Sequence, residues 1–300
     1  MKIKELLEYL KENGEEFEFS GDESDEVSGF SSLKSYKSGS FTWIKKAEAV
    51  PSGMDVSKCE LVITQENVSI GCPNVLYTDS SKRVFFSLVE YFAEANSSDT
   101  EGQSIGENSY ISDNASIGKN TKIGHNCSLN GEIKVGRNCL IGNNVSIRGR
   151  VSIGENSIIE SGVCIGDADL GYVEGVDGRR KMLKHYGGVE IGNSVYIGTG
   201  TTISRGTIDD TVIGDEGSID ALCQISHNCI LGKKNTLVAG SYLYGSVETG
   251  DNVYIASSII MNQIKLGDNV TVGMNSVVMS DVESGLTVFG TPARVRTKDK

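Results

Sequence analysis

Histidine is the side chain best suited to remove a proton near neutral pH, and the sequence contains three histidines. His227 has the most useful neighbours. Asp220, seven residues earlier, is the expected partner that would fix the tautomer of His227 and leave its Nε2 atom free to accept a proton from an amine or hydroxyl. The alternative for His227 is that it is an ordinary histidine in a surface turn. His125 is expected to be a histidine of that kind.

A six-residue repeat must position these side chains. An aliphatic residue occurs at every sixth position over residues 105–165, and the period resumes over residues 191–278, with a four-residue jump before Ile213 and a one-residue slip after Met261. A helix would need spacings of three and four. The six-residue period instead predicts a left-handed parallel β-helix, in which three hexapeptides form each triangular coil and the aliphatic residues stack inside the prism.

The remaining patterns predict the domain organisation. The expected divisions are a small α/β nucleotide-binding-like domain (1–95), a polar linker (96–103), the β-helix (104–290) with an ejected loop (166–188), and a C-terminal tail (291–300). Helices are expected over residues 1–13 and 81–93. Arg179, Arg180, Lys181 and Lys184 make the loop locally basic, which favours a flap over an anionic substrate; a solvated excursion is the alternative.

Composition excludes several classes of protein. The net charge of −12 argues against a general nucleic-acid binder. No apolar run reaches the ~18–20 residues that span a membrane, and the N-terminus lacks the features of a signal peptide, so a cytoplasmic protein is expected. The seven cysteines are an odd number, and four of them fall on the small corner position of the repeat. Buried apolar cysteines are therefore expected, without a metal or disulfide role.

Two segments carry a family resemblance. Residues 201–214 and 219–228 resemble the core of the UDP-3-O-acylglucosamine N-acyltransferases of lipid A synthesis, the LpxD family. The loop at residues 166–188 is similar to the substrate loop of that family, and residues 29–43 resemble the opening of its nucleotide-binding domain. The resemblance implies acyl transfer from a thioester to the amine of a nucleotide-linked sugar, with His227 as general base, Asp220 orienting it and backbone N–H groups stabilising the oxyanion.

The resemblance also implies further site residues. The residues expected to bind the acceptor are Trp43, Tyr172, His185, Asn228 and Gln263, and those expected to bind the donor are Gly245, Arg294 and Arg296. Trp43 stands where the family has a phenylalanine that stacks on uracil, and Gln263 where it has a second histidine. Lys46 and Ala49 replace an asparagine and a tyrosine of the uracil site.

The end of the sequence favours a particular donor. Residues 290–294, Gly-Thr-Pro-Ala-Arg, resemble the ending of CoA-dependent hexapeptide acetyltransferases, and the long C-terminal helices of the lipid A enzymes are missing. The leading hypothesis is therefore a homotrimeric enzyme that transfers a short acyl group from acyl-CoA, its co-substrate, to a UDP- or dTDP-linked amino sugar. No other cofactor is expected.

Three alternatives stay open. The first is the UDP-3-O-(3-hydroxyacyl)glucosamine N-acyltransferase of lipid A synthesis itself, which would use acyl carrier protein as donor. The second is a zinc carbonic anhydrase, which uses the same solenoid but needs three converging histidines. The third is a non-catalytic scaffold that binds sugar nucleotides.

Overall fold

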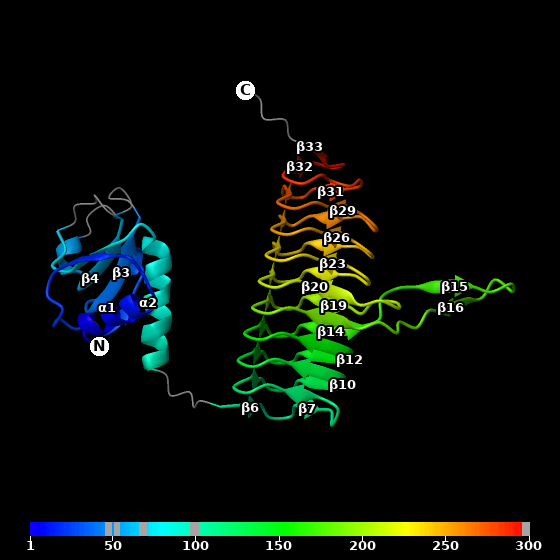
Figure 1. Cartoon of the computed structure of the whole chain (residues 1–300), viewed down its shortest axis with the longest axis horizontal. Coiled ribbons are helices and arrows are strands. Elements are labelled where there is room, and N and C mark those ends of the chain that lie inside the picture. Colours follow the sequence, from blue (N-terminus) through cyan, green and yellow to red (C-terminus); the bar gives the residue numbers. More distant parts are fainter. Residues whose placement is uncertain (46–49, 51–54, 66–70, 97–101, 296–300) are drawn as a thin grey trace. The chain divides into compact units, whose positions relative to one another are not determined.

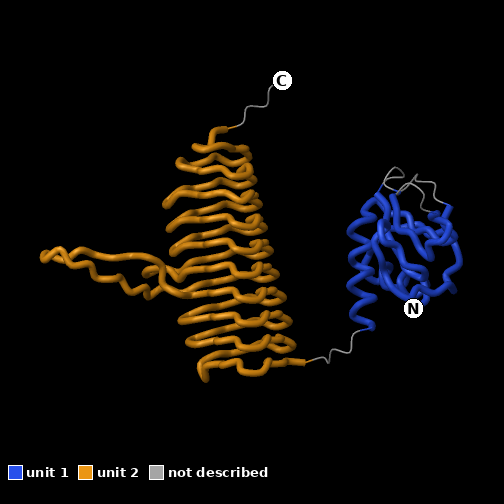
Figure 2. Tube along the Cα trace, turned by 180° about the vertical axis from the view of Figure 1, so that it is seen from behind, with its two compact units in different colours: residues 1–100 blue, residues 101–300 orange. Residues whose placement is uncertain are grey.

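The computed structural model describes residues 1–45, 50, 55–65, 71–96 and 102–295. The chain divides into two compact units, Met1–Thr100 and Glu101–Lys300 (Figure 2). Lys46, Ala49 and Arg296 lie outside the described residues. Within the described ranges, no helix combines the length and the apolar character needed to cross a membrane.

The first unit is a small α/β sheet with two helices. Its elements are α1 (Ile3–Glu12), β1 (Glu18–Ser20), β2 (Gly29–Phe30), β3 (Ser40–Ile44), β4 (Leu61–Thr64), β5 (Val75–Tyr77) and α2 (Ser81–Ala95), with short 3₁₀ turns at Leu33–Ser35 and Val56–Lys58. The strand order is β1-β5-β4-β3-β2, with β1 antiparallel to β5 and the other neighbours parallel.

The core of this unit follows from the amphipathic pattern of α1. Ile3, Leu6, Leu7 and Leu10 are all buried, because spacings of three and four put them on one face of the helix. That face and the apolar face of α2 pack with alternate residues of β3 and β4 in one hydrophobic cluster. Both helices predicted from sequence are therefore confirmed.

The second unit is the predicted left-handed parallel β-helix, whose coils stack as a prism in Figure 1. One long sheet contains β7 (Tyr110–Ile111), β8 (Ser116–Ile117), β10 (Ser128–Val135), β12 (Ser146–Ile153), β14 (Cys164–Asp167), β17 (Val189–Ile191), β19 (Thr202–Ser204), β20 (Thr211–Ile213), β22 (Gln224–Ile225), β23 (Ile230–Leu231), β25 (Tyr242–Leu243), β26 (Glu248–Thr249), β28 (Ile259–Ile260), β29 (Lys265–Leu266) and β31 (Val277–Val278).

The other long sheet covers the remaining side of the prism. It contains β6 (Ser104–Ile105), β9 (Lys122–Ile123), β11 (Leu140–Ile141), β13 (Ile158–Ile159), β18 (Tyr196–Ile197), β21 (Ser218–Ile219), β24 (Thr236–Leu237), β27 (Tyr254–Ile255), β30 (Thr271–Val272), β32 (Thr287–Phe289) and β33 (Arg294–Val295). All neighbours in this sheet are parallel except β32 and β33.

The interior of the prism is a continuous aliphatic stack. Ile147 pairs in register with Ile165, Ile165 with Ile203, Ile203 with Ile225, and Ile225 with Leu243. All five side chains are almost fully buried. The cysteines Cys127, Cys139, Cys223 and Cys229 are buried in the same core, which confirms their prediction as small apolar residues.

The position of the one-residue slip differs from the prediction. The sequence pattern placed Met261 inside the prism, but Leu243 pairs with Ile260, which is fully buried, and Met261 is only partly buried. The coil shortens between Ile255 and Ile260, where Ser257 has a positive φ of 42° and the Ser258 hydroxyl bonds to the carbonyl oxygens of its own coil and the next.

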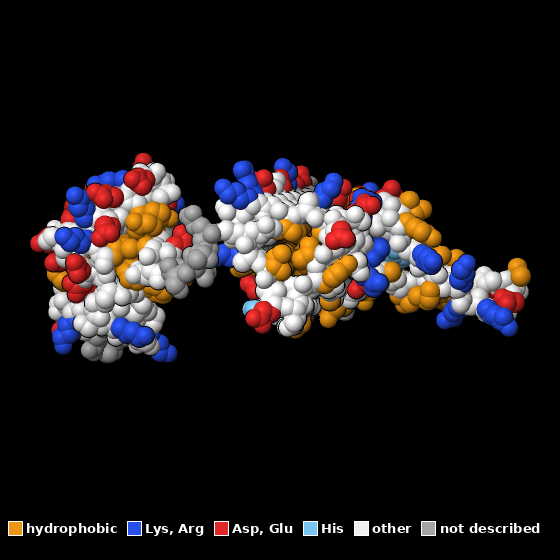
Figure 3. Space-filling model, turned by 90° about the horizontal axis from the view of Figure 1, so that it is seen from below, with side chains coloured by type: hydrophobic (Ala, Val, Ile, Leu, Met, Phe, Trp, Pro, Cys, Tyr) orange, Lys and Arg blue, Asp and Glu red, His pale blue; other side chains and the backbone are white. Residues whose placement is uncertain are grey.

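The ejected loop is a β-hairpin. Its strands β15 (Tyr172–Glu174) and β16 (Arg180–Met182) pair antiparallel and project from the prism as an arm (Figure 1). Lys and Arg side chains share its surface with apolar ones (Figure 3). Residues 167–186 also include four carboxylates, at Asp167, Asp169, Glu174 and Asp177, which offset its four cations. The expectation of a locally basic loop therefore holds only for its second half.

Candidate active site

One corner of the prism carries half of the predicted site residues. Because Ile203, Ile225 and Leu243 are stacked in register, the residues two positions later, Arg205, His227 and Gly245, occupy the same corner of successive coils. Backbone hydrogen bonds continue this column, from Ser246 N–H to His227 C=O and from Gln263 N–H to Gly245 C=O, both 2.9 Å long. The structure thus brings His227, Gly245 and Gln263 together.

The ring of His227 is oriented by its neighbour in sequence. Its Nδ1 atom lies 3.0 Å from the Oδ1 atom of Asn228. Asn228 has a backbone φ of 58°, in the left-handed region that asparagine tolerates better than most residues. This turn places the two consecutive side chains beside each other.

The orientation of the Asn228 amide follows from its other partners. Its Oδ1 atom accepts hydrogen bonds from the Thr207 backbone N–H (3.0 Å) and hydroxyl (2.8 Å), and its Nδ2 donates to the Asp209 carbonyl (3.0 Å). Because Oδ1 can only accept, His227 Nδ1 must carry the proton in this contact. In the neutral tautomer that this contact selects, Nε2 is the nitrogen without a proton, the arrangement that a general base uses.

The predicted partner of His227 is elsewhere. The Asp220 carboxylate accepts hydrogen bonds from the backbone N–H groups of Ala221 (2.7 Å) and Ala239 (3.2 Å). Among the described residues, Asp220 makes no hydrogen bond with His227. Asp220 follows β21 and His227 follows β22, so different corners of the prism hold them. Within this chain Asn228, and not Asp220, is the residue whose side chain contacts the His227 ring and can orient it.

The base of the ejected loop meets His227. The Oδ2 atom of Asp169 accepts a hydrogen bond from the His227 backbone N–H (3.3 Å). His185, only 7% exposed, lies with its ring edge-to-face to that of His227, at 5.5 Å between ring centroids. The Nδ1 atom of His185 lies 3.4 Å from the Asp169 backbone N and 3.3 Å from the Arg205 carbonyl oxygen. His185 and Asp169, from opposite ends of the loop, therefore border the same site.

Gly245 provides the space beside the candidate base. A Cβ atom at this position would lie 2.6 Å from both Cε1 and Nε2 of His227, so a larger residue would displace the ring. Gln263, one coil further, is exposed and has a positive φ of 63°. The edge of the His227 ring that carries Cε1 and Nε2 therefore packs over Gly245, in the space that a larger side chain would occupy.

A second insertion supports Asn228. Residues 205–211, the predicted phase jump, form a tight loop bonded to the end of the ejected loop, from Tyr186 N–H to Thr207 C=O (2.8 Å) and from Gly187 N–H to Gly206 C=O (3.0 Å). Arg150 holds the far side through two hydrogen bonds to Asp210, of 2.7 and 2.6 Å. The same carboxylate accepts from Gly188 N–H (2.7 Å), and the guanidinium keeps the pKa of Asp210 below its ordinary value.

Two predicted residues of the second unit lie away from His227, and a third belongs to the first unit. Tyr172 is on the arm, where the Arg180 guanidinium stacks over its ring at 4.4 Å from the centroid. Arg294 lies in β33 on the last described coil, where it is exposed and its guanidinium bonds to the Ala293 carbonyl. Trp43 lies in β3 of the first unit and lines a cavity of about 630 Å³. The other lining residues include Lys45, just after β3, and Lys82, Arg83 and Phe86 in the first turns of α2.

Two other features are separate from this corner. His125 is an exposed turn residue whose Nδ1 atom accepts the Glu107 backbone N–H at 2.9 Å. Within the described ranges, no three residues of the types His, Cys, Asp and Glu are arranged to hold a metal ion.

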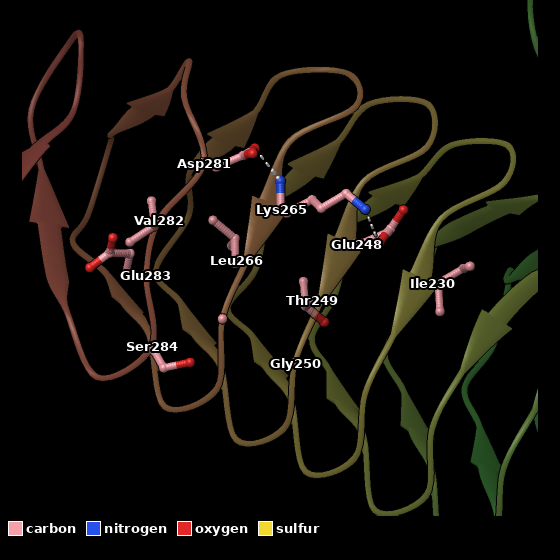
Figure 4. A pocket seen from close by; sticks show the side chains of 11 residues that line it. Ile230, Glu248, Thr249, Gly250, Lys265, Leu266, Asp281, Val282, Glu283 and Ser284 are labelled. Carbon is pink, nitrogen blue, oxygen red and sulfur yellow. Dashed lines mark hydrogen bonds and ion pairs between the residues drawn. The ribbon is translucent and has the colours of Figure 1, made fainter.

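A groove of about 720 Å³ lies on the face formed by β23, β26 and β29, where Lys265 pairs with Glu248 (Figure 4).

Sequence reasoning missed Asp169, Thr207 and the pair Arg150–Asp210. Asp169 lies in the ejected loop, and Thr207 and Asp210 lie in the second insertion; both stretches interrupt the six-residue period. Arg150 lies on strand β12, where it pairs with Asp210. The interruptions were visible in the sequence, but the residues that they bring together are up to 60 positions apart. The breaks in the repeat were the available signal.

Comparisons with known proteins agree with the repeat. Residues 132–167 match the bacterial transferase hexapeptide (six repeats), and residues 114–148 and 247–280 match the hexapeptide repeat of succinyl-transferase. The model is similar to a solved UDP-N-acetylglucosamine acyltransferase from Campylobacter jejuni, with 26% identity, a TM-score of 0.56, and coverage of 65% of this chain and 72% of that one. The fold and these matches define a hexapeptide-repeat β-helix.

The resemblance to the UDP-3-O-acylglucosamine N-acyltransferases is confirmed. One such protein, from Legionella pneumophila (strain Lens), is 43% identical over 89 residues, which are 30% of this chain and 26% of the relative. Another, from Sulfurimonas denitrificans, is 32% identical over 130 residues, 43% of this chain and 41% of the relative. The matched regions thus span less than half of these relatives.

Proposed function

We propose that this protein is an N-acyltransferase that moves an acyl group from a thioester to the amine of a nucleotide-linked amino sugar. The observation that carries the proposal is the hydrogen bond from His227 Nδ1 to Asn228 Oδ1. In the neutral ring this leaves Nε2 as the nitrogen without a proton, on the ring edge that packs over Gly245. The similarity to proteins named as acyltransferases of UDP-linked sugars supplies the substrate class.

The reaction needs one base and one oxyanion site. As the sugar amine attacks the thioester carbonyl, His227 Nε2 removes its proton; the new C–N bond forms and the C–S bond then breaks. The departing thiolate takes the proton back from the imidazolium. Backbone N–H groups of the corner, including that of Gly245, are the proposed donors to the tetrahedral oxyanion. Proton transfer of this kind contributes ~10²–10⁴ in rate.

The name of the relatives supports a choice of acceptor, and the family resemblance supports a choice of donor. Their name favours UDP-3-O-acylglucosamine as acceptor, which is the alternative considered for the sequence, over a UDP or dTDP amino sugar acylated from a short acyl-CoA. With this acceptor the donor is a 3-hydroxyacyl carrier protein. Trp43 in its cavity is the proposed platform for the base of the nucleotide. We propose a homotrimer as the functional assembly, as hexapeptide β-helices generally form.

The test follows product formation with each donor. Purified full-length protein is incubated with UDP-3-O-(3-hydroxyacyl)glucosamine, or with a panel of UDP- and dTDP-amino sugars. The donor is acetyl-CoA, 3-hydroxybutyryl-CoA or 3-hydroxyacyl carrier protein, and the released thiol and the amide product are measured. We expect turnover with the carrier-protein donor. Turnover only with a CoA donor would contradict this choice and support transfer of a short acyl group from acyl-CoA.

A matched pair of variants tests the base. His227→Ala should reduce kcat by ~10²–10⁴. His125→Ala removes an exposed turn histidine of the same solenoid and should leave kcat within about twofold. If wild-type protein acylates none of these sugars with any donor, the enzyme proposal fails and a sugar-nucleotide-binding scaffold becomes the better hypothesis.

A further inference from the structure

A cavity of about 480 Å³ lies under the ejected loop, next to the candidate active site. Its walls come from both ends of the loop, at Asp167–Ala168 and Leu183–Tyr186. The coils contribute Asn130, Arg148, Gly149 and Arg205. Since Asn130 pairs with Arg148, and the preceding Ile147 stacks below Ile165 and Ile203, this cavity occupies the same corner of the prism as His227.

The walls of this cavity are positively charged. Arg148, Lys184 and Arg205 are its cations and Asp167 is its one carboxylate, so its formal charge is +2 in a chain with a net charge of −12. Arg148 Nη1 lies 3.3 Å from Asp167 Oδ1, and both side chains are more than half exposed. An ion pair of this kind is weak and exchanges readily for an incoming anion.

Arg205 is held rigidly at the cavity wall. Its Nε donates to the Gly166 carbonyl oxygen, and its guanidinium lies flat against Gly149, where a Cβ atom would lie 2.8 Å from Nη1. A fixed guanidinium presents its remaining N–H groups without losing side-chain freedom on binding. Such groups match phosphate oxygens in both charge and geometry.

His185 joins the cavity to the candidate base. It lines the cavity and its ring centroid lies 5.5 Å from that of His227. The two rings are in direct edge-to-face contact, so the cavity borders the candidate base through His185. A phosphate group in the cavity would lie on the side of His185 away from the contact with His227.

We propose that the cavity is an anion subsite that binds the diphosphate of the nucleotide-linked acceptor. The subsite rests on the proposed function for its ligand, while its affinity for a diphosphate is a property of the cavity alone. Arg148, Lys184 and Arg205 supply the charge-assisted hydrogen bonds. Asp167 must release Arg148 when the anion binds, so this carboxylate weakens the interaction.

Binding of inorganic pyrophosphate to the full-length protein, measured by isothermal titration calorimetry, tests the subsite directly. Arg148→Gln should weaken binding about fivefold, a modest value because the side chain is exposed. Asp167→Asn should strengthen it about twofold, and added salt should weaken it. Arg137→Gln is the matched control, because Arg137 is equally exposed and pairs with Glu155 in the same solenoid.

The opposite signs of the two substitutions are the decisive result, since a loss of local structure would not strengthen binding. Equal affinities for Arg148→Gln, Arg137→Gln and wild type would overturn the subsite, as would an absence of pyrophosphate binding. Melting temperatures of the variants confirm that all are folded.

Steady-state kinetics separates this proposal from the proposed function. If both hold, Arg148→Gln raises KM for the nucleotide sugar about fivefold and leaves kcat nearly unchanged. Acyl transfer with an unchanged KM would overturn the subsite and keep the enzyme. Pyrophosphate binding that responds to Arg148 and Asp167, in a protein without transfer activity, would keep the subsite and overturn the enzyme.

Discussion

His227 and Asn228 are adjacent in sequence and hydrogen-bonded through their side chains, with 3.0 Å between Nδ1 and Oδ1. The acceptor is thus a neutral amide held by Thr207 and Asp209, where the sequence suggested a carboxylate. An amide fixes the tautomer of the ring but gives less stabilisation to an imidazolium than a carboxylate would. Several measurable consequences follow from this site.

Replacing Asn228 by alanine should lower kcat about 10- to 100-fold, because the ring of His227 loses the group that fixes its tautomer. Asn252→Ala is the control, since Asn252 has nearly the same positive φ (57°) at an exposed corner and shares its backbone strain. Asn228→Ala should lose more stability than Asn252→Ala, because it also removes the hydrogen bonds of the amide to Thr207 and Asp209. Kinetics is therefore compared at a temperature at which both variants are folded. An equal loss of kcat in both would contradict the orienting role of Asn228.

Gly245→Ala should reduce activity strongly while the fold remains intact, because the new methyl group would displace the His227 ring from its position. The matched substitution is Gly217→Ala, where the nearest atoms to a Cβ are at an ordinary 3.4 Å. Kinetics and melting temperature are measured on both. If Gly245→Ala retained full activity, the position of the His227 ring over Gly245 would not matter to the reaction.

Asp220→Asn should leave kcat within about twofold, because this carboxylate bonds to the backbone N–H groups of Ala221 and Ala239. The measurement compares kcat of this variant with that of Asn228→Ala under the same conditions. A fall of more than about tenfold would show that Asp220 reaches a catalytic histidine across a subunit interface.

The ion pair between Arg150 and Asp210 should contribute stability that depends on pH. The folded-state pKa of Asp210 is lowered, chiefly by the Arg150 hydrogen bond, so the contribution is present above the unfolded-state pKa of ~4 and is lost as pH falls through the folded-state pKa. Urea unfolding of wild type and Arg150→Gln from pH 7 to 3 should show a difference of ~1 kcal/mol that shrinks with acid. A constant difference across this range would contradict the assignment.

Trp43 offers a spectroscopic test of the first unit, since it is the one tryptophan in the sequence. Titration with UDP should change its fluorescence if the base stacks on the indole ring. Trp43→Phe should keep most of the affinity, measured by calorimetry, and Trp43→Ala should weaken binding by ~1–2 kcal/mol. Unchanged emission together with unchanged affinity in Trp43→Ala would exclude this cavity as the nucleotide site.

The fold was predictable because, in a repeat protein, the local six-residue pattern also determines which residues meet in successive coils. Each inward aliphatic residue, such as Ile147, Ile165 or Ile203, faces its own copy in the next coil, so the sequence period fixes the pairing register. The slip between Ile255 and Ile260 was misplaced by one hexapeptide because Ile260 and Met261 are both apolar, and only the shortened turn at Ser257 decides between them.

The site was predictable only in part. His227 was selected by its chemistry and Gly245 by the family resemblance, and stacking of successive coils brings them together. Asp220 was chosen as the partner because it is a nearby carboxylate in sequence. The contacts of Asn228 with Thr207, and of Arg150 with Asp210, depend on how two irregular loops pack, which no period describes.

The strand β12 gives the molecule freedom to change its substrate. Its first residues pair with β14, where the chain leaves the prism, and its last residues pair with β17, where the chain returns. The ladder of coils is therefore complete whatever the length of the excursion between them. Evolution, or a protein engineer, can exchange the arm at residues 170–183 as one unit, while Asp169 and His185 keep their contacts with His227 and the coil keeps its register.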